Sequence, residues 1–172
     1  FNLVSAIDSA RDNTIILALD GDDWLPNKNI LSRLNKIYSD TNVWITAGSY
    51  IDNVHHAVSR PVITENFWTD NLRRMQWTLS HLRTFRKKLF NKIKKEDMID
   101  VDGEYYKFTW DRVIMYPMVE MSGPEHFKPI NEIMYVYNRA NPISVDRVHR
   151  SEQLRIESVL RNKKPYGRIE KL

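Results

Sequence analysis

Three aspartates lie within four residues of one another, at Asp20, Asp22 and Asp23, with Gly21 among them. They directly follow the apolar residues 14–19. Clustered carboxylates repel one another unless a cation neutralises them, and Mg²⁺ or Mn²⁺ prefers oxygen ligands while retaining positions for water and substrate phosphates. Because open α/β sheets bind ligands beyond the carboxyl ends of their strands, these residues indicate a site for a divalent ion and a nucleotide.

A helix cap is the alternative interpretation of the same residues. Asp23 would then cap the helix that follows, and Asp20 and Asp22 would be solvated turn residues near its positive end. An EF-hand loop does not fit, because Trp24 stands at the fifth loop position and Leu25 at the sixth, where the turn needs glycine. An isolated D-x-D leaves both the metal site and the cap open.

The acidic cluster is predicted to lie in the turn between a strand and a helix. Continuous hydrophobicity over residues 14–19 is typical of a strand covered on both faces. Pro26 suits the start of a helix, and the next apolar residues recur at helical spacing: Ile30, Leu31, Leu34 and Ile37. The other predictions are a helix over 1–11, a strand over 43–47 ended by Gly48, a loop over 52–66, a turn at Asp102 and Gly103, a strand over 130–138 and a helix over 152–161. The stretch "WDRVIMYPMVEMSG" gets no assignment, because Pro117 would interrupt a helix there. This order predicts an α/β fold with a sheet of mixed direction.

A basic stretch lies between residues 71 and 95, without an acidic residue to offset it. Apolar residues recur there every three or four positions from Leu72 to Ile93, which predicts one long amphipathic helix with the basic residues off the apolar stripe. Such a stripe is either a solvated helix face or a surface that attracts phosphates, nucleic acid or an anionic membrane. No interleaved aromatic residues or recognition motif accompany it, which counts against nucleic acid.

Length and composition are those of one globular domain or a large piece of one. The chain has 172 residues, of which 42% are hydrophobic and 28% charged, and its formal net charge is +4. With no cysteine, disulfides, thiolate metal sites and thiol nucleophiles are excluded. No apolar run approaches the ~20 residues of a membrane span and no leader opens the sequence, so we expect a cytoplasmic protein or one at the cytoplasmic face of a membrane.

The phrase "ILALDGDDWLPNKNILSRL" resembles the strand, D-x-D-D, aromatic or Leu, Pro, helix signature of nucleotide-sugar glycosyltransferases with the GT-A fold, in particular the family 2 type. The resemblance continues through "HLRTFRKKLF", "TWDRVIMYPMVEMSG" and "YVYNRANPIS", in the order expected for the acceptor half of that domain. It implies a GT-A-like, Rossmann-like mixed sheet flanked by helices. It also implies inverting transfer of a sugar from a nucleoside diphosphate sugar, with a UDP-sugar favoured, to an acceptor hydroxyl on a glycan, protein or lipid.

The resemblance assigns the acidic cluster to the donor and its metal ion, Mn²⁺ or Mg²⁺. Asp22 would be the leading metal ligand, and Asp20 would bind the metal and lie near the nucleoside. Asp23 would support donor binding. His126 or His149 would complete the metal shell, and no spacing argument selects between them.

Catalysis in this family requires a carboxylate that removes the proton of the acceptor hydroxyl. By order along the chain, Asp111 in "TWDRV" is the first candidate and Glu120 in "VEMSG" the second. An ion pair beside Arg112 or a helix cap is the structural alternative for Asp111. The residues expected at the acceptor are Trp110, His81 and Arg83, and the last two could instead face the leaving diphosphate. The structural alternatives are a packed or surface histidine at position 81 and a core tryptophan at position 110.

The resemblance divides the chain into a metal and donor side (1–70), an acceptor side (71–150) and a C-terminal helix and tail (151–172). The strands that bind the base and ribose in this family would precede Phe1, so the chain is expected to be the C-terminal portion of such a domain. The alternative function is a noncatalytic module that uses a basic helix over 71–95 to contact nucleic acid or anionic membrane. A transferase would at most touch a membrane peripherally through these basic residues, and a phosphoryl-transfer enzyme would need a phosphate cradle that the sequence lacks.

Overall fold

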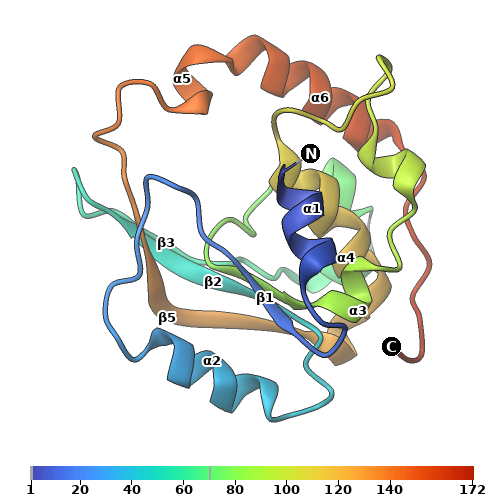
Figure 1. Ribbon diagram of the computed structural model, residues 1–172, viewed down its shortest axis with the longest axis horizontal. Helices are drawn as coiled ribbons and strands as arrows, with labels where there is room; N and C mark the ends of the chain where they lie inside the picture. Colours follow the sequence, from blue (N-terminus) through green and yellow to red (C-terminus); the bar gives the residue numbers. More distant parts are fainter. Residues whose placement is uncertain (1, 70) are drawn as a thin grey trace.

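Five strands form one mixed sheet, and helices cover both of its faces, in the computed structural model, which describes residues 2–69 and 71–172 (Figure 1). The elements in chain order are α1 (Asn2–Ser9), β1 (Ile15–Ala18), α2 (Ile30–Tyr38), β2 (Ile45–Asp52), β3 (Val58–Ser59), η1 (Glu65–Trp68), η2 (Leu72–Arg74), β4 (Arg83–Arg86), α3 (Lys87–Phe90), η3 (Lys95–Met98), α4 (Trp110–His126), β5 (Phe127–Tyr137), α5 (Val145–Val148) and α6 (Arg150–Asn162). The predicted α/β class with a mixed sheet is confirmed.

The sheet interleaves the two parts of the chain that were expected to form separate halves. Strand β4 lies between β1 and β2 and is antiparallel to both. Strand β5 runs parallel to β2, and the short β3 pairs antiparallel with the end of β2. Strand β4, from the expected acceptor side, thus lies between β1 and β2, from the expected donor side. Residues of the two expected sides can therefore meet at one end of the sheet.

Two apolar cores hold the helices to the sheet. Helix α2 lies on one side of the sheet, whereas α1, α3 and α4 lie on the other (Figure 1). On the α2 side, Ile30 and Leu34 pack with Leu82, Met134 and Tyr135. The larger core lies on the opposite side and contains residues of β2, α3, α4 and α6. Helix α4 contributes most to it, because its apolar residues are buried along most of its length.

The prediction of one long helix over 71–95 is wrong. These residues form η2, an irregular segment, β4, α3 and the start of η3. The apolar residues that suggested a helix belong to different elements that reach the core separately. The basic residues are also not all on a solvated face, because Arg73, Arg83 and Lys87 are buried.

Two smaller predictions are also corrected. Strand β2 does not end at Gly48 but continues through it, and the absence of a side chain there lets Leu82 approach so closely that a Cβ would lie 2.8 Å from its backbone nitrogen. The segment around Pro117, which the sequence pattern does not assign, forms α4; Pro117 lies buried within this helix, whose backbone departs from helical geometry at Gly123. The expected cover on both faces of β1 agrees with the structure, since Ile16 packs against the larger core and Leu17 against the core on the α2 side.

The remaining elements agree closely with prediction, except that the expected loop over 52–66 contains the short strand β3 and the start of η1. Helices α1, α2 and α6 and strand β5 occur where hydrophobic spacing placed them. The turn at Asp102 and Gly103 is present, with a positive φ of 82° at the glycine and a bridge between Ile99 and Tyr105. Over the described residues, every helix is too short or too polar to cross a bilayer.

Candidate active site

Antiparallel pairing of β1 with β4 brings Asp20 and His81 together. The register aligns Ala18, the last residue of β1, with Arg83, the first residue of β4. Asp20 and His81 therefore lie just beyond the paired residues, at the same end of the two strands. The Oδ2 atom of Asp20 accepts a hydrogen bond of 3.0 Å from Arg83 Nη2 and lies 3.9 Å from His81 Nδ1.

The acidic turn is also fixed to the end of β5. Trp24 and Val136 form an antiparallel bridge, with backbone hydrogen bonds of 3.3 and 2.9 Å. Asp23 accepts hydrogen bonds from the Tyr135 hydroxyl and from the Asn138 backbone N–H, the latter at 2.7 Å. The turn is therefore held between two strands, and its carboxylates have defined positions.

The helix-cap interpretation of Asp23 is wrong. Helix α2 begins only at Ile30 and its N-cap is Asn29, so the acidic turn lies well before the helix. Asp22 is exposed, and its carboxylate accepts a hydrogen bond of 2.5 Å from the side chain of Asn141, which follows β5.

A pocket of about 520 Å³ opens over this turn. Asp111, in the first turn of α4, lies in its wall 3.6 Å from Arg83 Nη1. Arg83 therefore forms ion pairs with both Asp20 and Asp111, and its side chain is only 3% exposed. Its guanidinium carbon lies 4.6 Å from the centre of the Trp110 ring. The lining combines these polar groups with apolar side chains from the start of α4 and the residues just before it, Trp110 and Phe108, and from the chain after β5, Ile143 and Val145.

Burial shifts the pKa values of Asp20, Asp23 and His81 in this pocket. It raises the pKa of the Asp20 carboxyl, outweighing the lowering effect of Arg83. It also raises the pKa of Asp23, although hydrogen bonds from Tyr135 and Asn138 act in the opposite direction. Burial, with a contribution from Arg83, lowers the pKa of His81 to about 2, so its imidazole is neutral at physiological pH.

Asp20, Asp23 and His81 can together hold a metal ion. One ligand atom from each lies within 4.8 Å of those of the other two. The His81 ring is stacked on Tyr135 and Tyr137, with centroids 4.4 and 5.3 Å away, and its Nδ1 atom has no hydrogen-bond partner among the described residues. Two carboxylates and one neutral imidazole form a donor set suited to a divalent ion.

The structure gathers most of the residues that were predicted for the site. Those lining the pocket are Asp20, Asp22, Asp23, His81, Arg83, Trp110 and Asp111. Glu120 is not among them, because its carboxylate is buried against Arg73 elsewhere on α4. The contacts of Asn138 and Asn141 with the acidic turn were missed, although both residues lie in the quoted stretch "YVYNRANPIS". Asn141 binds Asp22 through its side-chain amide, so its residue type could have suggested the contact. Asn138 binds Asp23 through its backbone N–H, which its residue type does not indicate.

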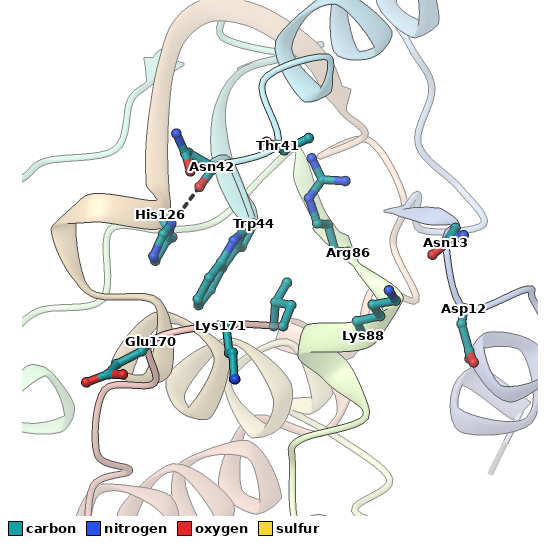
Figure 2. A pocket seen from close by; sticks show the side chains of 11 residues that line it. Asp12, Asn13, Thr41, Asn42, Trp44, Arg86, Lys88, His126, Glu170 and Lys171 are labelled. Atoms are coloured by element: carbon teal, nitrogen blue, oxygen red, sulfur yellow. Dashed lines mark hydrogen bonds between the residues drawn. The ribbon is translucent and has the colours of Figure 1, made fainter.

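Neither histidine proposed to complete the metal shell is in the group of possible metal ligands. His149 stacks on Phe108 at the edge of the pocket, with ring centroids 4.6 Å apart. His126 lies in a separate hollow of about 430 Å³ with Trp44, on which it stacks at 3.5 Å (Figure 2). Its Nδ1 atom is hydrogen bonded to the Asn42 carbonyl at 2.8 Å. The histidine that joins the acidic turn is instead His81, which was expected to contact the acceptor.

Comparison with models of known protein families gives no match to this chain, and comparison with curated proteins gives none either.

Proposed function

We propose that the chain carries the metal and acceptor side of an inverting, GT-A-like glycosyltransferase that uses a nucleoside diphosphate sugar, with a UDP-sugar favoured. One observation carries the proposal. The ligand atoms of Asp20, Asp23 and His81 converge within 4.8 Å in a pocket whose wall also carries the carboxylate of Asp111. Metal ligands and a base in one pocket are the minimum that metal-dependent transfer to a hydroxyl requires.

Asp20 and Asp23 would hold the divalent ion, Mn²⁺ or Mg²⁺. Asp22, which was expected to be the leading metal ligand, is not in the converging group of Asp20, Asp23 and His81 and would face the donor from the open side of the turn. When bound, such an ion acts as a Lewis acid that neutralises the charge developing on the departing diphosphate. Arg83 pairs with one oxygen of Asp20, whereas Asp23 accepts hydrogen bonds from uncharged donors. Burial raises the pKa of both carboxyls, and a divalent ion between them would offset the cost of keeping both charged.

Asp111 is the base in this proposal. The acceptor oxygen would form a bond to the anomeric carbon as the bond from that carbon to the diphosphate breaks, and the hydroxyl proton would pass to the Asp111 carboxylate. Arg83 orients Asp111 by its contact at 3.6 Å. Glu120 is not suited to the role, since Arg73 binds both of its carboxylate oxygens in the interior.

The apolar part of the pocket suits a sugar or another acceptor with an apolar face. Trp110 and Phe108 are partly buried in its wall, whereas Ile143 and Val145 are 76% and 43% exposed. Aromatic rings beside a few placed polar groups are typical of small-molecule sites. The acceptor would pack on this wall with its hydroxyl directed at Asp111.

The alternative of a basic binding module receives less support. Residues 71–95 do not form the single helix that would present a basic stripe. Arg73 is paired with Glu120, Arg83 with Asp20, and the ammonium of Lys87 donates to backbone carbonyls of residues 8 and 10. Buried and paired cations of this kind contribute to the fold rather than to a surface for polyanions.

The test is release of UDP from UDP-glucose, UDP-galactose and UDP-N-acetylglucosamine, with and without Mn²⁺. We expect Mn²⁺-dependent release from at least one donor, and its loss in Asp22→Ala. Glu96→Gln is the matched control, because Glu96 is an exposed acid outside the pocket. Release that is equal without Mn²⁺, or unchanged in Asp22→Ala, would contradict the proposal.

A further inference from the structure

The Nδ1 atom of His81 is a buried polar atom without a hydrogen-bond partner among the described residues. The side chain is 9% exposed, and the atom lies 3.9 Å from Asp20 Oδ2, too far for a hydrogen bond. Buried polar atoms are nearly always satisfied, so an orphaned one calls for an explanation. A ring nitrogen of His81 also lies within 4.8 Å of one carboxylate oxygen each of Asp20 and Asp23, and a cation shared by the three side chains would satisfy it.

The ring is held in this orientation by packing. Tyr135 and Tyr137 stack on it at interplanar angles of 12° and 19°, and Tyr50 meets it edge to face at 5.4 Å. These contacts give the ring a fixed position beside the carboxylate of Asp20.

The geometry points to His81 Nδ1 as a direct ligand of the divalent ion, beside Asp20 and Asp23, in a site that prefers transition metals to Mg²⁺ and Ca²⁺. The inference rests on the proposed function only for the presence of an ion in this pocket, and not on sugar transfer. Imidazole suits transition metals, whereas Mg²⁺ and Ca²⁺ are bound mainly through oxygen. A nitrogen ligand thus narrows the choice between Mn²⁺ and Mg²⁺ to Mn²⁺ or a related ion.

Pulsed electron paramagnetic resonance of the chain loaded with Mn²⁺ alone tests the inference. A coordinated imidazole gives nitrogen hyperfine coupling in the electron spin echo, and we expect this coupling in the wild-type protein. Competition titrations should show Mn²⁺ binding more tightly than Mg²⁺, because imidazole suits transition metals and Mg²⁺ prefers oxygen. His81→Phe keeps an aromatic ring between the tyrosines and should lose both the coupling and the preference.

A second variant guards against misfolding of His81→Phe. The other histidines, His55, His56, His126 and His149, are each replaced by glutamine, which leaves His81 and its packing intact. This variant should retain the nitrogen coupling. Loss of coupling there, or its persistence in a folded His81→Phe protein, would overturn the inference.

The remaining outcomes separate this inference from the proposed function. Mn²⁺ bound in the acidic pocket without nitrogen coupling would overturn the role of His81 and leave the transferase proposal standing. Nitrogen coupling without turnover of any UDP-sugar would support the role of His81 and count against the transferase. A wild-type chain that binds no Mn²⁺ would overturn both.

Discussion

Glu120 binds the guanidinium of Arg73 through both carboxylate oxygens, at 2.7 and 2.8 Å, with the two side chains only 6% and 3% exposed. The same carboxylate accepts the backbone N–H of Tyr166 at 3.0 Å. This ion pair connects α4 with η2 and the C-terminal segment. A carboxylate held in this way stabilises the fold and is not available to a substrate hydroxyl.

We predict that Glu120→Ala lowers the free energy of unfolding by about 3–5 kcal/mol, because it leaves Arg73 charged and unpaired in the interior. Urea unfolding measures this change. The double variant Arg73→Met, Glu120→Leu should recover most of the loss, since it removes both charges. A single variant as stable as wild type would contradict the structural role given to this pair.

Asp111→Asn should lower Mn²⁺-dependent sugar transfer by at least about 100-fold while leaving Mn²⁺ affinity nearly unchanged, because an amide cannot accept the proton. Single-turnover release of UDP and titration with Mn²⁺ provide the two readouts. Asp100→Asn is a suitable control, because Asp100 pairs with Arg155 and does not line the pocket that contains Asp111. Transfer that persists at the wild-type rate would remove Asp111 from the mechanism.

The two neighbouring aspartates should differ in their effect on stability. Asp23→Ala removes the acceptor of the Tyr135 hydroxyl and the Asn138 N–H, so we expect a loss of about 1–3 kcal/mol. Asp22→Ala removes an exposed carboxylate and should change stability by less than about 0.5 kcal/mol. Thermal unfolding of both variants without metal makes the comparison, and equal losses would count against the anchoring of the turn through Asp23.

Acid stability should depend on Asp100. Hydrogen bonds from Arg155 are the main cause that lowers the pKa of this carboxyl below its usual value of 3.8. Its stabilising contribution is therefore complete above that pH and is lost as the pH falls through the lower pKa of the folded state. Unfolding curves between pH 5 and pH 2 should fall less steeply for Asp100→Asn than for wild type, and parallel curves would show that the pair contributes nothing.

The sequence was sufficient to predict the helices and strands in which the spacing of apolar residues follows one buried face. Helix α2 buries Ile30 and Leu34 at helical spacing, and β5 begins and ends near the predicted residues. The spacing failed over 71–95, because Arg83 and Lys87 are buried through ion pairs and hydrogen bonds that only the assembled fold provides. A buried arginine gives no apolar signal, so the strand that contains it could not be recognised by hydrophobicity.

The acidic turn of the candidate site could be predicted from the sequence, whereas its histidine could not. Asp20, Asp22 and Asp23 are adjacent in sequence, so their clustering needed no tertiary information. His81 joins them only through the register of β1 with β4, which aligns residues far apart in the chain. Periodicity predicts which face of a strand is buried but not which strand lies beside it. The sequence therefore did not indicate that His81, rather than His126 or His149, lies beside the acidic turn.

Anomalous scattering at the manganese edge, from crystals grown with Mn²⁺ and UDP, tests the central claim most directly. We predict a manganese peak between the carboxylates of Asp20 and Asp23, with the UDP diphosphate in the pocket that Asp111 lines. The histidine nitrogen at that peak should be Nδ1 of His81. Manganese and UDP bound instead beside Trp44 and His126 (Figure 2), or a peak remote from all three aspartates, would contradict the account.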